Sequence, residues 1–343
     1  MLLLGFAACA ASRGRNVNDV VFTQYSPLSG GAEMVQRTLP PLAVRRIVEA
    51  LEAKHAALAQ QSIDLSKEKF DLYIPEGPPP PGGYGLLLFI SPGSAPTRPR
   101  VWRGTLDRHH LIFVSPQNAG NTTNLFDRRV PLGLLAYHNV RASYPIDDKR
   151  VYVMSYSGGG RVAEILALSY PDVFRGVVVH AGADPVDGAQ GVYKPSIDRW
   201  RMFQRNRLVY ISGDHDLENL ALDEASRTSM RHACMLNIKS KLARGQAHDF
   251  LDAVNMDTAL SAIEEPGEVD AAELARCNER LQREIAGRLA EARASIDRGD
   301  LARARTQLDA IDAQFGGLAG PEILELDARL PRPPIGHVGG HHP

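Results

Sequence analysis

The sequence lacks several features that would assign it to well-known functional classes. Its 39 Lys and Arg residues are balanced by 40 Asp and Glu residues, so the 343-residue chain has a formal net charge of −1 at pH 7. Proteins that bind nucleic acid through its phosphates need a clustered surplus of basic side chains, so we expect no nucleic-acid partner. No apolar stretch approaches the roughly 18 residues of a membrane-spanning helix. With 44% hydrophobic residues, the composition is that of an ordinary globular protein.

Cysteine is also scarce, with only Cys9, Cys234 and Cys277 in the whole chain. Three cysteines do not make the disulfide framework of a small secreted domain. The chain also lacks the HExxH motif and the Cys and His spacings of metal sites, so we expect neither a metal nor another cofactor. If Cys9 is modified, Cys234 and Cys277 remain as a candidate disulfide, which only an oxidising compartment would permit.

The first residues of the chain form a short apolar run, from Leu2 to Ala8, which ends at Cys9. The run resembles the end of a bacterial lipoprotein signal, in which small residues precede a cysteine that is lipidated. We therefore expect residues 1–9 to be a signal remnant and Cys9 to tether the protein to a membrane. The protein would then be exported, either to the periplasm or to the outer membrane. The alternative is a frayed apolar terminus on a cytoplasmic protein.

Between residues 68 and 265 the hydrophobic pattern alternates between strands and helices. Continuous apolar runs such as Leu86 to Ile90 are typical of strands buried on both faces of a parallel sheet. Helical periodicity is clearest over 129–143 and 159–170. Together they predict an α/β fold, with a mostly parallel sheet flanked by helices. The other strands are expected at 70–74, 111–114, 151–154, 177–179, 208–211 and 235–238.

The segments on either side of this region have different patterns. Residues 10–67 are expected to form an N-terminal extension with one amphipathic helix, from Pro40 to Gln61. After residue 266 the pattern is helical alone, and Gly299 divides two apolar helix faces. This predicts a C-terminal α-helical hairpin over 266–330 that braces the α/β domain. Residues 331–343 are expected to be a disordered tail.

The segment with the clearest chemistry is the strand, turn and helix from Val151 to Ala163. The turn reads S-Y-S-G-G over 155–159, with a small residue two positions before and two after Ser157. A sharp turn needs small residues at those positions because their backbones come close together. The turn resembles the G-x-S-x-G nucleophile elbow of α/β-hydrolases, with Ser155 in place of the first glycine. The resemblance implies that Ser157 is a nucleophile at the apex of the turn.

A serine nucleophile needs a base, and the base needs a carboxylate that orients it. In α/β-hydrolases the acid and then the histidine follow the serine along the chain. Asp216 follows the apolar run 208–211 at the position expected of the acid, with Asp214 and Asp184 as alternatives. His248 lies in a glycine-containing loop after the last expected strand, and it is the expected base.

A site of this kind also needs oxyanion donors and a substrate pocket. The resemblance implies that the Gly158 N–H is one donor, and that Ser91 or Gly93, in the loop after an early strand, supplies the second. Three aromatic residues are the expected pocket lining, namely Tyr156, Trp102 and Trp200. The alternative is that these aromatic side chains pack in the core or against loops.

Further segments resemble the polyhydroxybutyrate-depolymerase-like and feruloyl-esterase-like branch of the α/β-hydrolases. They are F-D-L-Y-I-P at 70–75, A-G-N at 119–121, D-D-K-R-V-Y-V at 147–153 and Y-P-D-V-F-R-G at 170–176. The similarity covers about residues 68–262. It implies a serine hydrolase that cleaves a small or polymeric carboxylic ester through an acyl-enzyme intermediate. The alternatives are a peptidase or acyltransferase with the same triad, or a catalytically idle, lipid-anchored scaffold.

Overall fold

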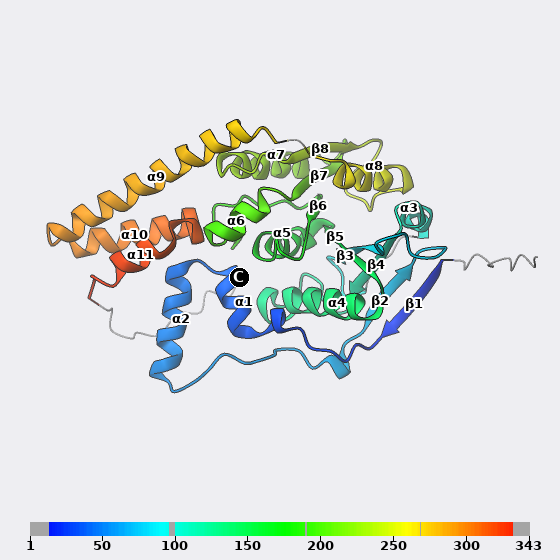
Figure 1. Ribbon diagram of the computed structural model, residues 1–343, viewed down its shortest axis with the longest axis horizontal. Helices are drawn as coiled ribbons and strands as arrows, with labels where there is room; N and C mark the ends of the chain where they lie inside the picture. The colour runs from blue at the N-terminus through cyan, green and yellow to red at the C-terminus, as the bar shows by residue number, and fades with distance from the viewer. Residues whose placement is uncertain (1–13, 96–99, 189–190, 268, 332–343) are drawn as a thin grey trace, which may run out of the picture.

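The computed structural model describes residues 14–95, 100–188, 191–267 and 269–331, and its centre is one eight-stranded sheet (Figure 1). The strands are β1 (Arg15–Val20), β2 (Phe70–Ile74), β3 (Tyr84–Ile90), β4 (Leu111–Pro116), β5 (Ile146–Ser155), β6 (Gly176–His180), β7 (Arg207–Gly213) and β8 (Ile238–Ala243). They lie in the order β1-β2-β4-β3-β5-β6-β7-β8. Strand β2 is antiparallel to both of its neighbours, whereas β3 to β8 are all parallel.

Helices cover both faces of this sheet (Figure 1). They are α1 (Gly31–Thr38), α2 (Pro41–Ala53), α3 (Arg103–Arg108), α4 (Val130–Ser143), α5 (Gly160–Ser169), α6 (Ile197–Phe203), α7 (Leu217–His232), α8 (Ala253–Glu264), α9 (Ala271–Asp297), α10 (Leu301–Phe315) and α11 (Gly320–Asp327). Side chains alternate along each strand, so Leu86 and Leu88 of β3 pack with α4 and α5, whereas Leu87 and Phe89 pack with α3 and α8. The predicted α/β class is confirmed.

The first strand was not expected. Residues 10–67 were predicted to lie outside the shared core, but β1 pairs with β2 and forms one edge of the sheet. Val17 pairs with Leu72, and Val20 pairs with Phe70. Most β1 side chains are exposed, as an edge strand allows, and the strand therefore has little apolar pattern for sequence analysis to detect.

The helix predicted from Pro40 to Gln61 is shorter than expected. Helix α2 has a proline in its first turn and ends at Ala53, after which His55 adopts a positive φ of 50°. The residues that follow α2 have no regular structure as far as the short turn at 65–67. A separate helix, α1, precedes α2, although only one helix was expected in this extension.

The C-terminal region contains α9 and α10 of the expected hairpin, followed by α11, which was not expected. Its apolar stripes are buried among the three helices, including Leu281, Leu289, Leu308 and Ile323. The helices dock on the N-terminal helix α2 rather than only on the helices that flank the sheet. Asp312 accepts a hydrogen bond from the Leu42 backbone N–H at 3.1 Å, and Asp327 pairs with Arg45 at 3.0 Å.

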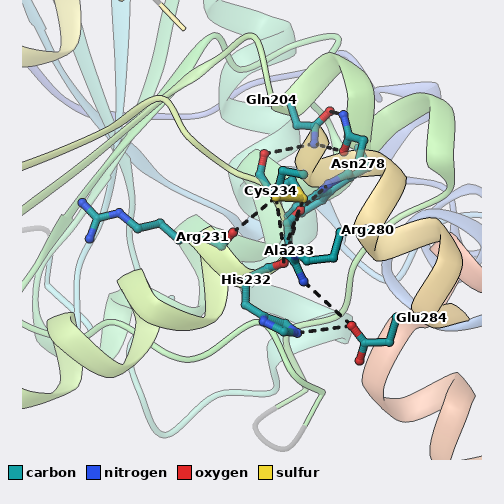
Figure 2. Close-up of a disulfide and its surroundings, with 10 residues drawn as sticks. Gln204, Arg231, His232, Ala233, Cys234, Asn278, Arg280 and Glu284 are labelled. Atoms are coloured by element: carbon teal, nitrogen blue, oxygen red, sulfur yellow. Dashed lines mark hydrogen bonds and ion pairs between the residues drawn. A yellow bond between two sulfur atoms is a disulfide. The ribbon is translucent and has the colours of Figure 1, made fainter. Parts of the chain in front are cut away.

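A disulfide attaches the other end of this region, because Cys234, just after α7, is bonded to Cys277 of α9 (Figure 2). The candidate pair is therefore confirmed. Polar contacts surround it: Gln204 Nε2 donates to the Cys234 carbonyl at 3.0 Å, and Arg280 donates to the His232 carbonyl at 2.8 Å. Disulfide and hydrogen bonds together hold the start of α9 against the α/β region.

Some predictions fall on parts of the chain that the structure does not describe. Cys9 and the proposed signal remnant lie outside the described residues, as does almost all of the predicted tail at 331–343. Among the helices that are described, none combines the length and the apolar character needed to cross a membrane. Nor do the described residues gather three or more His, Cys, Asp or Glu side chains that could hold a metal ion.

Candidate active site

Ser157 lies at a sharp turn between β5 and α5, at the carboxyl end of the sheet. Its φ of 51° is in the left-handed region, which a serine rarely adopts. Close packing forces this turn, since a Cβ atom at Gly159 would lie 2.3 Å from the Ile90 carbonyl oxygen. Ser155, at the other small position, is fully buried. The local sequence therefore supplies the small residues that this strained turn requires.

The three residues predicted as a triad lie in hydrogen-bonding contact. His248 Nε2 is 2.9 Å from Ser157 Oγ, and His248 Nδ1 is 2.8 Å from Asp216 Oδ2. Asp216 follows β7 and caps the start of α7, while His248 lies in the loop after β8. Because the parallel strands all have their carboxyl ends on this side of the sheet, residues that are distant in sequence meet here. The arrangement allows a proton to pass from Ser157 to His248 while Asp216 orients the imidazole.

The electrostatics of Asp216 favour its ionised form. Its side chain is largely buried, and burial alone would raise the pKa of the carboxyl group. Hydrogen bonds from Asn219 and His248 outweigh burial, so the pKa of Asp216 lies below its ordinary value. The Asn219 Nδ2 atom lies 2.9 Å from both carboxylate oxygens and 3.0 Å from His248 Nδ1. Sequence analysis missed Asn219, whose only signal is its place in the first turn of a helix capped by Asp216.

The two alternative acids make other contacts. Asp214 accepts a hydrogen bond from the Gly245 backbone N–H at 2.9 Å. Asp184 pairs with Arg161 at 2.9 Å. Of the three candidates, only Asp216 is within hydrogen-bonding distance of His248 among the contacts of the described residues. The geometry therefore favours Asp216.

A cavity of about 700 Å³ opens beside Ser157. Its wall combines apolar side chains, such as Leu125, Phe126 and Leu222, with polar and charged ones. The remaining lining residues are Asn121, Thr123, Asn124, Arg129, Gly158, Arg161, Ala181, Gly182, Ala183, Asp184 and Asn219. A mixed wall of this kind can bury an apolar acyl or alcohol group while its polar groups orient an ester carbonyl.

The aromatic residues predicted to line the pocket lie elsewhere. Trp102 is fully buried beside Phe89, and its indole N–H donates to the Leu251 carbonyl. Trp200 is buried against Phe203, and its indole N–H donates to a carbonyl as well. Both predictions were wrong, because each indole finds its packing and its acceptor within the core.

Tyr156 lies close to the site but does not line this cavity within the described part of the chain. Its hydroxyl donates to the His248 carbonyl at 2.9 Å, and its ring centroid is 5.2 Å from that of His248. Tyr156 therefore supports the loop that carries His248, rather than forming the pocket wall as predicted.

The candidate oxyanion donors differ in their positions. Gly158 lines the cavity beside Ser157. The Gly93 N–H already donates to Ser91 Oγ at 3.1 Å, and neither Ser91 nor Gly93 is among the described residues that line the cavity. Asn121 does line it and packs against Gly158, since a Cβ atom at position 158 would lie 2.2 Å from Asn121 Nδ2. Sequence analysis included Asn121 only as part of the A-G-N segment.

The order of the strands and the places of the three polar residues decide the fold family. The serine follows β5, the acid follows β7 and the histidine follows β8 of a sheet in which only β2 is antiparallel to its neighbours. The protein has the α/β-hydrolase fold. No protein-family model matches this chain.

Two relatives match short stretches of the chain. It is 29% identical over 110 residues to a poly(3-hydroxybutyrate) depolymerase of Ralstonia pickettii, covering 28% of this chain and 22% of the relative. It is 28% identical over 102 residues to poly(3-hydroxyalkanoate) depolymerase C of Paucimonas lemoignei, covering 26% of this chain and 23% of the relative. The chain thus spans less than a quarter of the length of each. These matches confirm the predicted resemblance to the depolymerase-like branch.

A solved structure is similar as well. A poly(3-hydroxybutyrate) depolymerase from Bordetella parapertussis superposes with a TM-score of 0.43 at 18% identity, covering 61% of this chain and 88% of the other. The assignment of the fold rests on the strand order and on the positions of the polar residues, rather than on this superposition.

Proposed function

We propose that this α/β-hydrolase is a serine carboxylic-ester hydrolase that works through an acyl-enzyme intermediate. The observation that carries the proposal is the continuous series of contacts from Ser157 through His248 to Asp216. In the first half-reaction His248 Nε2 takes the Ser157 proton while Oγ bonds to the ester carbonyl carbon. His248 then gives this proton to the departing alcohol, which leaves Ser157 acylated. In the second half-reaction His248 takes a proton from a water molecule, whose oxygen bonds to the acyl carbon; the bond to Ser157 Oγ then breaks, His248 returns the proton to Oγ, and the carboxylic acid is released.

Stabilisation of the tetrahedral intermediate needs donors aimed at its oxyanion. We assign this role to the Gly158 N–H and, as the second donor, to the Asn121 side-chain amide. Both residues line the cavity next to Ser157, and Asn121 packs directly against Gly158. This replaces the expectation that Ser91 or Gly93 provides the second donor.

For the substrate we propose an ester of the hydroxyalkanoate class, small or polymeric. The support is the resemblance to depolymerases whose names specify such polymers, together with the mixed apolar and polar wall of the cavity. Because the chain spans less than a quarter of those relatives, their substrates are carried over only as this proposal.

We also propose that the protein is exported and tethered through a lipidated Cys9. The amino-terminal sequence supports this, as does the disulfide between Cys234 and Cys277. Disulfides persist in oxidising compartments and are rare in the reducing cytosol.

The test of the enzymatic proposal is the Ser157→Ala variant, assayed on p-nitrophenyl esters of short acids and on hydroxyalkanoate oligomers. Loss of the nucleophile is expected to lower kcat by several orders of magnitude, leaving the melting temperature close to that of the parent. The parent is also expected to be labelled by a fluorophosphonate probe, which the variant should not be. Activity of Ser157→Ala within tenfold of the parent would refute the proposal, as would an unlabelled, inactive parent.

A further inference from the structure

A buried arginine lies behind the candidate oxyanion site. Arg129 immediately precedes α4, is 5% exposed, and is one of the residues that line the cavity beside Ser157. Its guanidinium donates three hydrogen bonds, all of them to backbone carbonyl oxygens. The acceptors are Ala119 at 2.8 Å, Gly158 at 2.9 Å and Ser91 at 3.1 Å.

These three carbonyl groups belong to three separate segments that meet at the site. Ser91 is in the loop after β3, and Ala119 is in the loop after β4, two residues before Asn121. Gly158 directly follows Ser157. The planar guanidinium therefore fixes both segments that carry the assigned oxyanion donors, and it ties them to the loop after β3.

The charge of Arg129 is also unusual. No carboxylate among the described residues pairs with it, and the charge that lowers its pKa in addition to burial is that of another cation, Arg161. Burial lowers the pKa of Arg129 to about 10, so the group is still a cation at neutral pH. A buried cation without an anion costs free energy, and an anion that forms next to it recovers part of that cost.

From this geometry we infer that Arg129 is a positioning residue for the oxyanion site: it aligns the Gly158 and Asn121 donors and places a positive charge behind the developing oxyanion. The inference rests on the proposed esterase function and adds a residue to it. Arg129 acts through the backbone, so its effect belongs to the transition state, where the oxyanion exists, and not to binding of the uncharged ester.

The experiment compares Arg129→Met with Arg128→Met in the full chain. Arg128 is a matched control because it holds a carbonyl of the same loop, that of Asn118, and pairs with Glu68 without touching Gly158 or Ser91. Loss of one direct oxyanion donor lowers kcat roughly 10²–10³-fold. For Arg129→Met, whose effect is indirect, we expect kcat to fall roughly 10- to 100-fold with KM changed by less than about threefold. Arg128→Met should keep kcat within about twofold of the parent.

An arylboronic acid that forms a tetrahedral adduct with Ser157 gives a second readout. Its affinity should fall in parallel with kcat/KM in Arg129→Met, since a merely structural role would not weaken a transition-state mimic selectively. The inference would be overturned if a folded Arg129→Met variant kept its kcat within threefold of the parent. It would also be overturned if the fall in kcat/KM came entirely from a higher KM.

Should Arg129→Met fail to fold, Arg129→Lys decides the question. Lysine keeps the charge but cannot bridge three carbonyl groups with a planar fork. We expect a smaller loss of kcat at nearly constant KM, and a kcat equal to that of the parent would overturn the inference. A parent whose hydrolysis does not depend on Ser157 would instead refute the proposed function, so the two failures are distinguishable.

Discussion

At the scale of single residues, two buried aspartates near each other show how contacts set the behaviour of a carboxyl group. Asp216 is surrounded by donors, and its pKa is lowered. Asp223, seven positions after Asp216 and within α7, accepts one hydrogen bond from Ser212 Oγ at 2.8 Å, and its other oxygen has no hydrogen-bond partner among the described residues. Burial raises the pKa of Asp223 to about 7. The same residue type thus favours its ionised form at one position, whereas at the other the protonated form persists up to about pH 7.

The first prediction concerns the choice of acid. Asp216→Asn should lower kcat by roughly 10³–10⁴-fold, because an amide cannot stabilise the imidazolium and favours the wrong tautomer of His248. Asp214→Asn should change kcat by less than about fivefold, since an amide oxygen can still accept the hydrogen bond from Gly245. The measurement is turnover of a p-nitrophenyl ester by both variants. A larger loss in Asp214→Asn would reverse the assignment.

The second prediction concerns pH and stability. Since the pKa of Asp223 is about 7 in the folded protein against an ordinary value of 3.8, the unfolded chain loses this proton first as pH rises. As pH rises from about 4 to about 7, ionisation of this group therefore lowers the free energy of unfolding progressively. Above about pH 7 the loss is complete and amounts to roughly a few kcal/mol. The asparagine side chain of Asp223→Asn cannot ionise, so the melting temperature of Asp223→Asn minus that of the parent should increase from pH 5 to pH 8.

Glu218→Gln, at an exposed position of the same helix, is the matched control and should show no such change. Equal pH dependence of melting in the parent and in Asp223→Asn would contradict the prediction.

Sequence analysis singled out Ser157, Asp216 and His248, which the structure brings into contact, because each lies at a strand end with a recognisable local pattern. Asn121, Arg129 and Asn219 have no such pattern, since their contacts come from loops that only the folded sheet brings together. Trp102 and Trp200 were misplaced for a related reason. From sequence, a tryptophan in a loop or short helix could equally line a pocket or pack in the core. In the structure, both indole N–H groups donate to backbone carbonyl groups inside the protein, which places both side chains in the core.

At the scale of elements, the strands and helices with the clearest pattern of apolar residues were the ones predicted correctly. The central strands are buried on both faces and read as continuous apolar runs, so they were found. Strand β1 is an exposed edge strand, and it was missed. Strand β8, at the opposite edge, was expected at 235–238 but spans Ile238–Ala243, because its polar residues hide its extent. Helix α11 has only eight residues and follows α10 after the short turn Gly316–Ala319, so it was not separated from the expected hairpin.

The third prediction concerns the link between α9 and the α/β region. In the chain-entropy account, a disulfide between residues 43 positions apart stabilises the fold by about 4 kcal/mol. The double variant Cys234→Ser, Cys277→Ser should therefore have a clearly lower melting temperature than the oxidised parent. Reduction of the parent should lower its melting temperature in the same way but leave the variant unaffected. Identical melting of parent and variant under oxidising conditions would contradict this.

At the scale of the whole molecule, the N-terminal and C-terminal regions hold each other. Helix α2 contacts α10 and α11 through Leu42 and Arg45, so these three helices lie together at one end of the molecule, to the left of α5 and α6 in Figure 1. The sequence predicted each segment separately, but not their contact. Such a contact joins residues some 270 positions apart, and no periodicity within either segment encodes it.

The fourth prediction concerns location. When the full chain is produced in a bacterial host, the parent should fractionate with membranes and incorporate a labelled fatty acid, because Cys9 is proposed as the lipidated residue. Cys9→Ser should lose the label and the membrane association. The Cys234→Ser, Cys277→Ser variant should keep both, since its cysteines are not the proposed site. Recovery of unlabelled parent in the cytoplasmic fraction would contradict the proposal.

The position of the disulfide has a consequence for a protein exposed to proteases. The bond closes a ring of chain from Cys234 to Cys277 that contains β8, α8 and the loop carrying His248, whereas Ser157 and Asp216 lie before the ring. A single cut in this ring between Cys234 and His248 would place nucleophile and base on different fragments, yet the sulfur bridge would keep both fragments in one covalent molecule. The nicked protein would migrate as one species until it is reduced, and then as two.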